Sequence, residues 1–148
     1  MNHVLIVDDE AEIRASLEEI LREEGYGVAT AGTAGEAITL LQDAPYDVVL
    51  LTNFLHHFDR PTCVGLLEKI HAALRPGGWV ATLDFVPDEG KVSPPPSAGF
   101  AMTMLTTTAA GDVYTLAELT SMYEEAGFGG VEGRPIPMSP ETVVMGRA

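Results

Sequence analysis

Two adjacent aspartates, Asp8 and Asp9, follow the apolar run 4–7 and are the first residues whose type and place could support chemistry. Such a run is typical of a parallel strand covered on both faces, and open sheets bind ligands at the carboxyl ends of their strands. Carboxylate oxygens suit Mg²⁺, so the pair predicts a weak divalent-cation site, which Asp84 at a later strand end could partly complete. The structural alternative is that Asp9 caps the next helix with Glu12, and that Asp8 is solvated.

Two adjacent histidines, His56 and His57, follow the third expected strand. Imidazole serves as a general base or a metal ligand, but adjacent side chains point apart, so we do not expect the pair alone to chelate one zinc ion. The structural alternative is two histidines at a helix entrance, one packed and one solvated. Cys63 is the single cysteine; it excludes an internal disulfide and is expected to be a small packed hydrophobe.

Apolar spacing predicts the elements that position these residues. Strands at 4–7, 27–31 and 47–51 alternate with two helices, and this order calls for right-handed crossovers and a parallel sheet. Beyond them we expect a helix over 60–74, a strand over 79–85, a mobile loop over 87–99, a short helix over 100–107, a helix from Thr115 to Gly127, and paired strands at 130–137 and 142–147.

Composition narrows the classes of partner. The chain has 148 residues, 46% of them apolar, and a formal charge of −14 from 22 acidic and 8 basic residues. Nucleic acid and anionic membranes attract clustered Lys and Arg, so neither is an expected partner. The sequence holds no apolar run long enough to span a membrane, and we expect no signal peptide before the fold. We therefore expect a cytoplasmic protein, made by recombinant expression.

The first third of the chain resembles the receiver domain of bacterial response regulators. The resemblance rests on Val4–Glu10, on Leu21–Tyr26 and on Tyr46–Leu51. It implies that Asp8 and Asp9 bind magnesium and that an aspartate at the end of the third strand accepts a phosphoryl group. That position is Thr52, so phosphotransfer of the family type is expected to be absent.

The rest of the chain, from about Tyr46 to Ala148, resembles class I SAM-dependent O-methyltransferases. The resemblance rests on Thr52–Phe58, Leu74–Gly78 and Glu125–Phe128. It implies a glycine-rich cofactor turn after the first strand and a ribose-binding acid after the second. The first turn reads Asp-Asp-Glu-Ala instead, and no such acid is evident. From this departure we expect no cofactor-binding residues and no cofactor beyond a weakly bound magnesium ion.

The methyltransferase resemblance also assigns roles to single residues. His56 matches the histidine that deprotonates the acceptor hydroxyl in plant-type members, and His57 replaces the acid that follows it. We treat His56 as a vestigial candidate only, and expect no working catalytic residue. The segment Phe100–Leu105 resembles the lining of the acceptor cavity and could expose an apolar surface that promotes self-association. No specific partner is expected.

The two resemblances meet near residue 52 and lead to one fold and three functional hypotheses. We expect a single domain over 1–148, with a receiver-like half (1–51) and a methyltransferase-like half (52–148). The fold is a three-layer α/β sandwich with a doubly wound, Rossmann- or flavodoxin-like sheet of order 2-1-3-4-6-5 and an antiparallel last strand. The leading interpretation is an engineered chimeric scaffold that is not an enzyme. The alternatives are a degenerate receiver-like signalling module and a residual SAM-binding methyltransferase.

Overall fold

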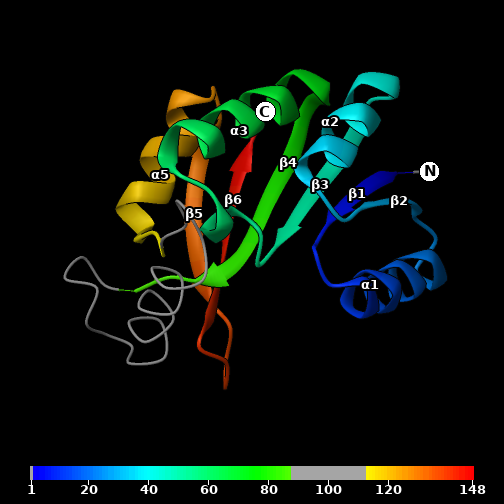
Figure 1. The fold of residues 1–148 in the computed structure, drawn as a ribbon, viewed down its shortest axis with the longest axis horizontal. Coiled ribbons are helices and arrows are strands. Elements are labelled where there is room, and N and C mark those ends of the chain that lie inside the picture. The colour runs from blue at the N-terminus through cyan, green and yellow to red at the C-terminus, as the bar shows by residue number, and fades with distance from the viewer. Residues whose placement is uncertain (1, 88–112) are drawn as a thin grey trace.

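The apolar run at the start of the chain forms β1 (His3–Val7), whose last four residues are buried. β1 lies between β2 (Gly27–Ala31) and β3 (Tyr46–Thr52), and both pairings are parallel. β3 pairs in parallel with β4 (Leu74–Phe85) on its other side. The computed structural model describes residues 2–87 and 113–148 of the chain (Figure 1).

The sheet ends in two antiparallel pairings. β6 (Glu141–Arg147) lies antiparallel between β4 and β5 (Gly129–Pro135). The six strands therefore run in the order β2-β1-β3-β4-β6-β5. This confirms the fold class and the strand order predicted from the sequence, including the reversed last strand.

Helices cover the sheet unequally. The helices α2 (Ala34–Asp43), α3 (Arg60–Ala73) and α5 (Leu116–Glu125) form one layer, because α3 contacts both of the others (Figure 1). α1 (Ala11–Glu23) packs against β1 and β2, and the right-handed crossover places it on the opposite face. The main core lies under the three-helix layer, and its largest fully buried side chains include Tyr123, Phe54, Leu51, Leu67, Ile70 and Met122.

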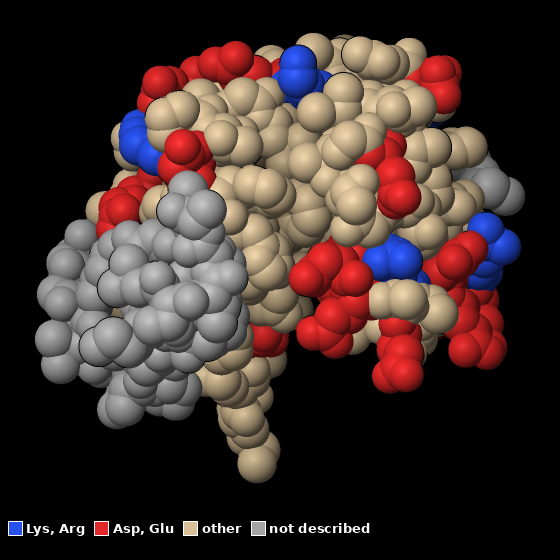
Figure 2. Space-filling model, in the orientation of Figure 1, with Lys and Arg blue, Asp and Glu red and all other residues tan. Residues whose placement is uncertain are grey.

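Helix α1 is less buried than its apolar spacing predicts. None of its residues is fully buried, and Ile20 is 54% exposed. The acidic residues of α1 face solvent, and Figure 2 shows acidic side chains gathered over this part of the molecule. The apolar face of α1 is therefore only partly buried, because no second helix of the described residues packs beside it.

The helix caps follow the sequence in part. Thr115, where the sequence predicts that the helix begins, forms a reciprocal capping box of α5 with Glu118. Thr33 caps α2 by accepting the Glu36 N–H, but the Glu36 carboxylate accepts the Gly32 N–H. The predicted Asp9 cap of α1 is wrong, because the N-cap position is Glu10 and no side chain caps that helix end.

Strand β4 begins earlier than predicted. It starts at Leu74 and includes the Pro-Gly-Gly sequence that we expected to separate a helix from a strand. Gly77 adopts a φ of +80°, which favours glycine, and its N–H donates to the carbonyl of Ala148. The β3–β4 register shifts between Tyr46 and Val48, which accommodates the extra residues. The expected loop over 87–99 lies outside the described residues except for Pro87, and so do the short helix over 100–107 and the Phe100–Leu105 surface.

We propose that residues 1–148 unfold as one unit, and a matched pair of isoleucines tests this proposal. Ile70 on α3 is fully buried, whereas Ile20 on α1 is 54% exposed. Ile70→Ala should lower the free energy of unfolding by roughly 2–5 kcal/mol, and Ile20→Ala by about 1 kcal/mol. Denaturant curves followed by circular dichroism and by Trp79 fluorescence should shift together in each variant. Separate midpoints for the two signals would contradict a single unit.

Candidate active site

A cleft lies where the carboxyl ends of β1, β3 and β4 meet the start of β6. Its volume is about 320 Å³. A neighbouring hollow of about 430 Å³ shares Asp9 and His57 with it and extends over the segment after β2, where it meets Gly32–Gly35. The residues that line the first cleft are Asp9, Glu10, Asn53, His56, His57, Phe85 and Glu141.

The inner wall of this cleft contains a buried histidine–carboxylate pair. His56 lies in the short 3₁₀ helix η1 (Leu55–His57), and Asp84 is the penultimate residue of β4. His56 Nδ1 lies 2.8 Å from Asp84 Oδ1, and the two residues are only 3% and 5% exposed. A carboxylate accepts hydrogen bonds, so Nδ1 carries the proton that it donates to Asp84, and in the neutral ring Nε2 is the nitrogen that carries the lone pair. Asp84 also accepts the Phe85 N–H, which fixes its orientation.

The second histidine has a different environment. His57 Nε2 lies 3.3 Å from Asp9 Oδ2, and both side chains are partly exposed. The rings of His56 and His57 are inclined by 57° and bind different carboxylates. The expectation of one packed and one solvated histidine is therefore confirmed, and the pair does not converge on one point.

The first aspartate is part of the protein interior. Asp8 is 1% exposed, so the expectation that it is solvated is wrong. Its Oδ2 accepts a hydrogen bond of 2.5 Å from the Thr52 hydroxyl, and its Oδ1 accepts the Glu10 N–H. The Arg14 guanidinium donates to its carbonyl. Asp8 thus ties the turn after β1 to the end of β3.

Asp8 and Asp9 are adjacent in the sequence, but their carboxylates contact different residues: Asp8 accepts from Thr52, and Asp9 contacts His57. Asp84, which we considered as a third cation ligand, binds His56 instead. Within residues 2–87 and 113–148, no group of three or more His, Cys, Asp or Glu side chains is placed to hold a metal ion. The weak magnesium site at Asp8 and Asp9 stays a prediction from the sequence.

Two residues that line the cleft, Asn53 and Glu141, were not predicted as site residues from the sequence. Asn53 adopts a φ of +48°, and its Oδ1 is a buried atom without a hydrogen-bond partner in the described structure. Glu141 reaches the cleft because it pairs with Phe85 across the β4–β6 ladder. The alternation of β4 was an available signal for Asp84, since it shares the inward face with the buried Val80 and Thr82.

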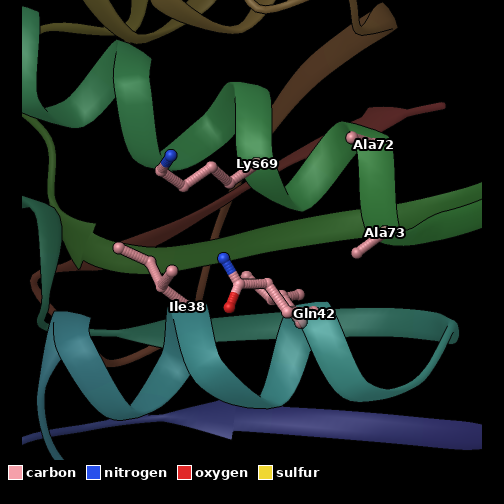
Figure 3. A pocket seen from close by; sticks show the side chains of 6 residues that line it. Ile38, Gln42, Lys69, Ala72 and Ala73 are labelled. Atoms are coloured by element: carbon pink, nitrogen blue, oxygen red, sulfur yellow. The ribbon is translucent and has the colours of Figure 1, made fainter.

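Another groove lies between α2 and α3, with a volume of about 190 Å³. Figure 3 shows Lys69 of α3 above Gln42 and Ile38 of α2, with Ala72 and Ala73 closing one end. The groove carries no acid–base pair and belongs to the helix layer. Lys69 thus lies in this groove, away from the residues that line the cleft.

Cys63 is packed as expected. It is fully buried, and its Sγ donates to the carbonyl of Leu55. Burial raises the pKa of its thiol to about 12. A protonated, enclosed thiol is a weak nucleophile, so Cys63 takes no part in the chemistry of the cleft.

The turn after β1 departs from a glycine-rich cofactor turn. It carries Asp8, Asp9 and Glu10, and the Glu10 N–H is already bonded to the Asp8 carboxylate. This turn therefore does not offer bare backbone N–H groups to a cofactor. At the other end of the cleft, the buried His56–Asp84 pair does fit the deprotonation of a hydroxyl group.

Comparison with known proteins identifies the family. The model of the O-methyltransferase domain matches residues 35–129, which is more than half of the chain. The chain belongs to this O-methyltransferase family. It is 34% identical over 101 residues to the tetracenomycin polyketide synthesis 8-O-methyl transferase TcmO of Streptomyces glaucescens, covering 68% of this chain and 30% of that protein.

Solved structures of methyltransferases share the fold. A Nostoc punctiforme protein assigned as an O-methyltransferase superposes with a TM-score of 0.79 at 32% identity, over 99% of this chain and 52% of that one. Human N-acetylserotonin methyltransferase in complex with SAM superposes with a TM-score of 0.71 at 20% identity, over 98% of this chain and 39% of that one. The chain spans about half the length, or less, of these relatives.

A short match concerns response regulators. The chain is 46% identical over 48 residues to the alginate biosynthesis transcriptional regulatory protein AlgB of Pseudomonas putida, which is 32% of this chain and 11% of that protein. This match agrees with the receiver resemblance noted in the sequence. It involves a segment that the methyltransferase folds also cover, because they extend over nearly the whole chain.

These findings correct three expectations. The interpretation as an engineered scaffold without activity is contradicted, because the family match begins at residue 35, before the supposed junction near Thr52, and one natural fold covers 99% of the chain. The expectation of no enzyme is contradicted by the O-methyltransferase relatives. The expectation of no cofactor is contradicted by the same family membership, since similar folds are known as complexes with SAM and SAH.

One finding bears on the expectation that no segment of the chain spans a membrane. Among the described residues, no helix combines the length and the apolar character needed to cross a bilayer.

The burial of Cys63 leads to a prediction for its reactivity. Because its thiol pKa is raised to about 12, the thiolate is scarce near neutral pH. Iodoacetamide at about pH 8.5 should label the native protein at least about a hundredfold more slowly than the denatured protein. Intact mass spectrometry measures both rates. Equal labelling rates would show that Cys63 is accessible in the folded state.

Proposed function

We propose that this chain carries the catalytic core of a SAM-dependent O-methyltransferase in which His56 is the general base. The observation that supports the proposal most is the buried His56–Asp84 pair, with Nδ1 and Oδ1 2.8 Å apart in the wall of the cleft. SAM, when bound, would supply an electrophilic methyl group and leave as SAH once its S–CH₃ bond is broken. His56 Nε2 would take the proton of the acceptor hydroxyl while the hydroxyl oxygen receives the methyl group.

Asp84 has a positioning role in this proposal. Its carboxylate holds the Nδ1–H tautomer of His56 and so presents the basic lone pair at Nε2. It also stabilises the imidazolium that forms when His56 takes the proton. Burial of both side chains keeps water from competing for the hydrogen bond that joins them.

We assign the hollow beside the catalytic cleft to the cofactor. It adjoins the ends of β1 and β2 and is lined by Gly32–Gly35, Phe54 and Phe58. The shared residues Asp9 and His57 connect it with the cleft that contains His56. In this arrangement the segment after β2 contributes the glycines that the turn after β1 lacks.

In this proposal the receiver-like segment, residues 1–51, has a structural role. Residues 1–51 supply β1, β2 and most of β3, and hence one edge of the sheet. Phosphotransfer is not part of the proposal, since Thr52 stands where a receiver carries its carboxylate and its hydroxyl is bonded to Asp8.

Substitutions in the pair test the proposed base. His56→Ala should reduce methyl transfer from SAM to catechol by about 10²–10⁴-fold, the usual contribution of a general base. Asp84→Asn should also reduce the rate, while the affinity for SAM stays unchanged in both variants. Transfer is measured with radiolabelled SAM and the full chain.

A histidine outside the site is the matched control. His71 on α3 packs against Phe128 and is not among the residues that line the cleft or the cofactor hollow, so His71→Ala should keep its rate within a few-fold of the parent. Equal losses for His56→Ala and His71→Ala would contradict the assignment of His56 as the base. Circular dichroism of each variant confirms that the comparison is made on folded protein.

A further inference from the structure

The charge of the catalytic cleft is strongly one-sided. Asp9, Glu10 and Glu141 line it, and its lining residues in the described structure include no Lys or Arg. The three carboxylates come from two elements, the turn after β1 and the start of β6. They therefore approach the cleft from different sides.

The basic groups near the cleft already contact other groups of the protein. The Arg14 guanidinium donates to the carbonyl of Asp8. His57 contacts Asp9, and His56 is bonded to Asp84. Apart from the imidazoles, no described residue that lines the cleft offsets the charge of Glu10 and Glu141.

A further group in the wall requires a hydrogen-bond donor. Asn53 Oδ1 is buried and accepts no hydrogen bond from the described residues. A buried acceptor without a partner costs free energy, which a ligand N–H group can recover. The cleft thus combines excess negative charge with an acceptor that lacks a donor.

From these observations we infer that the acceptor is cationic: a phenol or catechol that carries a protonated amine. The inference rests on the proposed methyltransferase function and adds the charge class of its substrate. The ammonium group lies toward Glu10 and Glu141. An acceptor with a carboxylate or phosphate meets like charge on both sides.

Three phenols of similar shape test the inference: tyramine, 4-ethylphenol and 4-hydroxyphenylacetate. Dissociation constants are measured by NMR titration of the full chain saturated with SAH, which carries no sulfonium charge. Tyramine should bind about tenfold more tightly than 4-hydroxyphenylacetate at low salt, with 4-ethylphenol between them, and the spread should shrink as salt is added. The amide signals of Asn53 and His57 should shift during the titration.

Charge-neutralising variants assign the effect to named side chains. Glu10→Gln and Glu141→Gln should each lower the preference for tyramine over 4-ethylphenol about twofold to fivefold, as expected for exposed ion pairs. Neither carboxylate makes a hydrogen bond within the described structure, and Glu10 does not cap α1, so both variants should fold. Glu68→Gln on α3, which borders a different hollow, is the matched control and should leave the preference unchanged.

The possible failures are distinguishable. Equal affinities for the three phenols would overturn the charge inference and leave the methyltransferase proposal standing. Binding of SAH without any phenol-induced shift at Asn53 or His57 would overturn the acceptor cleft, and the charge inference with it. Absence of SAH binding would overturn the proposed function itself.

Discussion

The pairing of β3 with both β1 and β4 is the constraint on which the site depends. β3 is in register with β1 through Val7 and Leu51, and with β4 through Thr52 and Leu83. This register brings Asp8 beside Thr52 and allows η1, which follows β3, to reach Asp84. A slip of one residue would turn the side chain of Asp84 to the other face of the sheet and separate it from His56.

The strand order was predictable because each strand carries a strong local signal. The apolar runs of β1 and β3 identify strands that are buried on both faces, and the helices between them require right-handed crossovers. The antiparallel β6 followed from the methyltransferase resemblance. The class of the fold could therefore be inferred from the sequence, whereas the start of β4 at Leu74 could not, because it depends on a register shift against β3.

The site was less predictable because its contacts join residues that are distant in the chain. His56 was identified as a candidate, but its bond to Asp84 spans 28 residues and follows only from the register of β4. The burial of Asp8 depends on Thr52, 44 residues away. The prediction of a scaffold without activity was wrong because the turn after β1 lacks the family's glycines, whereas the motifs around His56 lie within the family match over residues 35–129.

The proposed function requires that a chain with an acidic turn after β1 still binds the methyltransferase cofactor. Isothermal titration of the full chain with SAH measures this binding. We expect saturable binding with one molecule of SAH per chain, weakened when Gly32 is replaced by a bulky residue at the edge of the proposed cofactor hollow. No heat of binding at high micromolar protein, with the fold intact by circular dichroism, would contradict it.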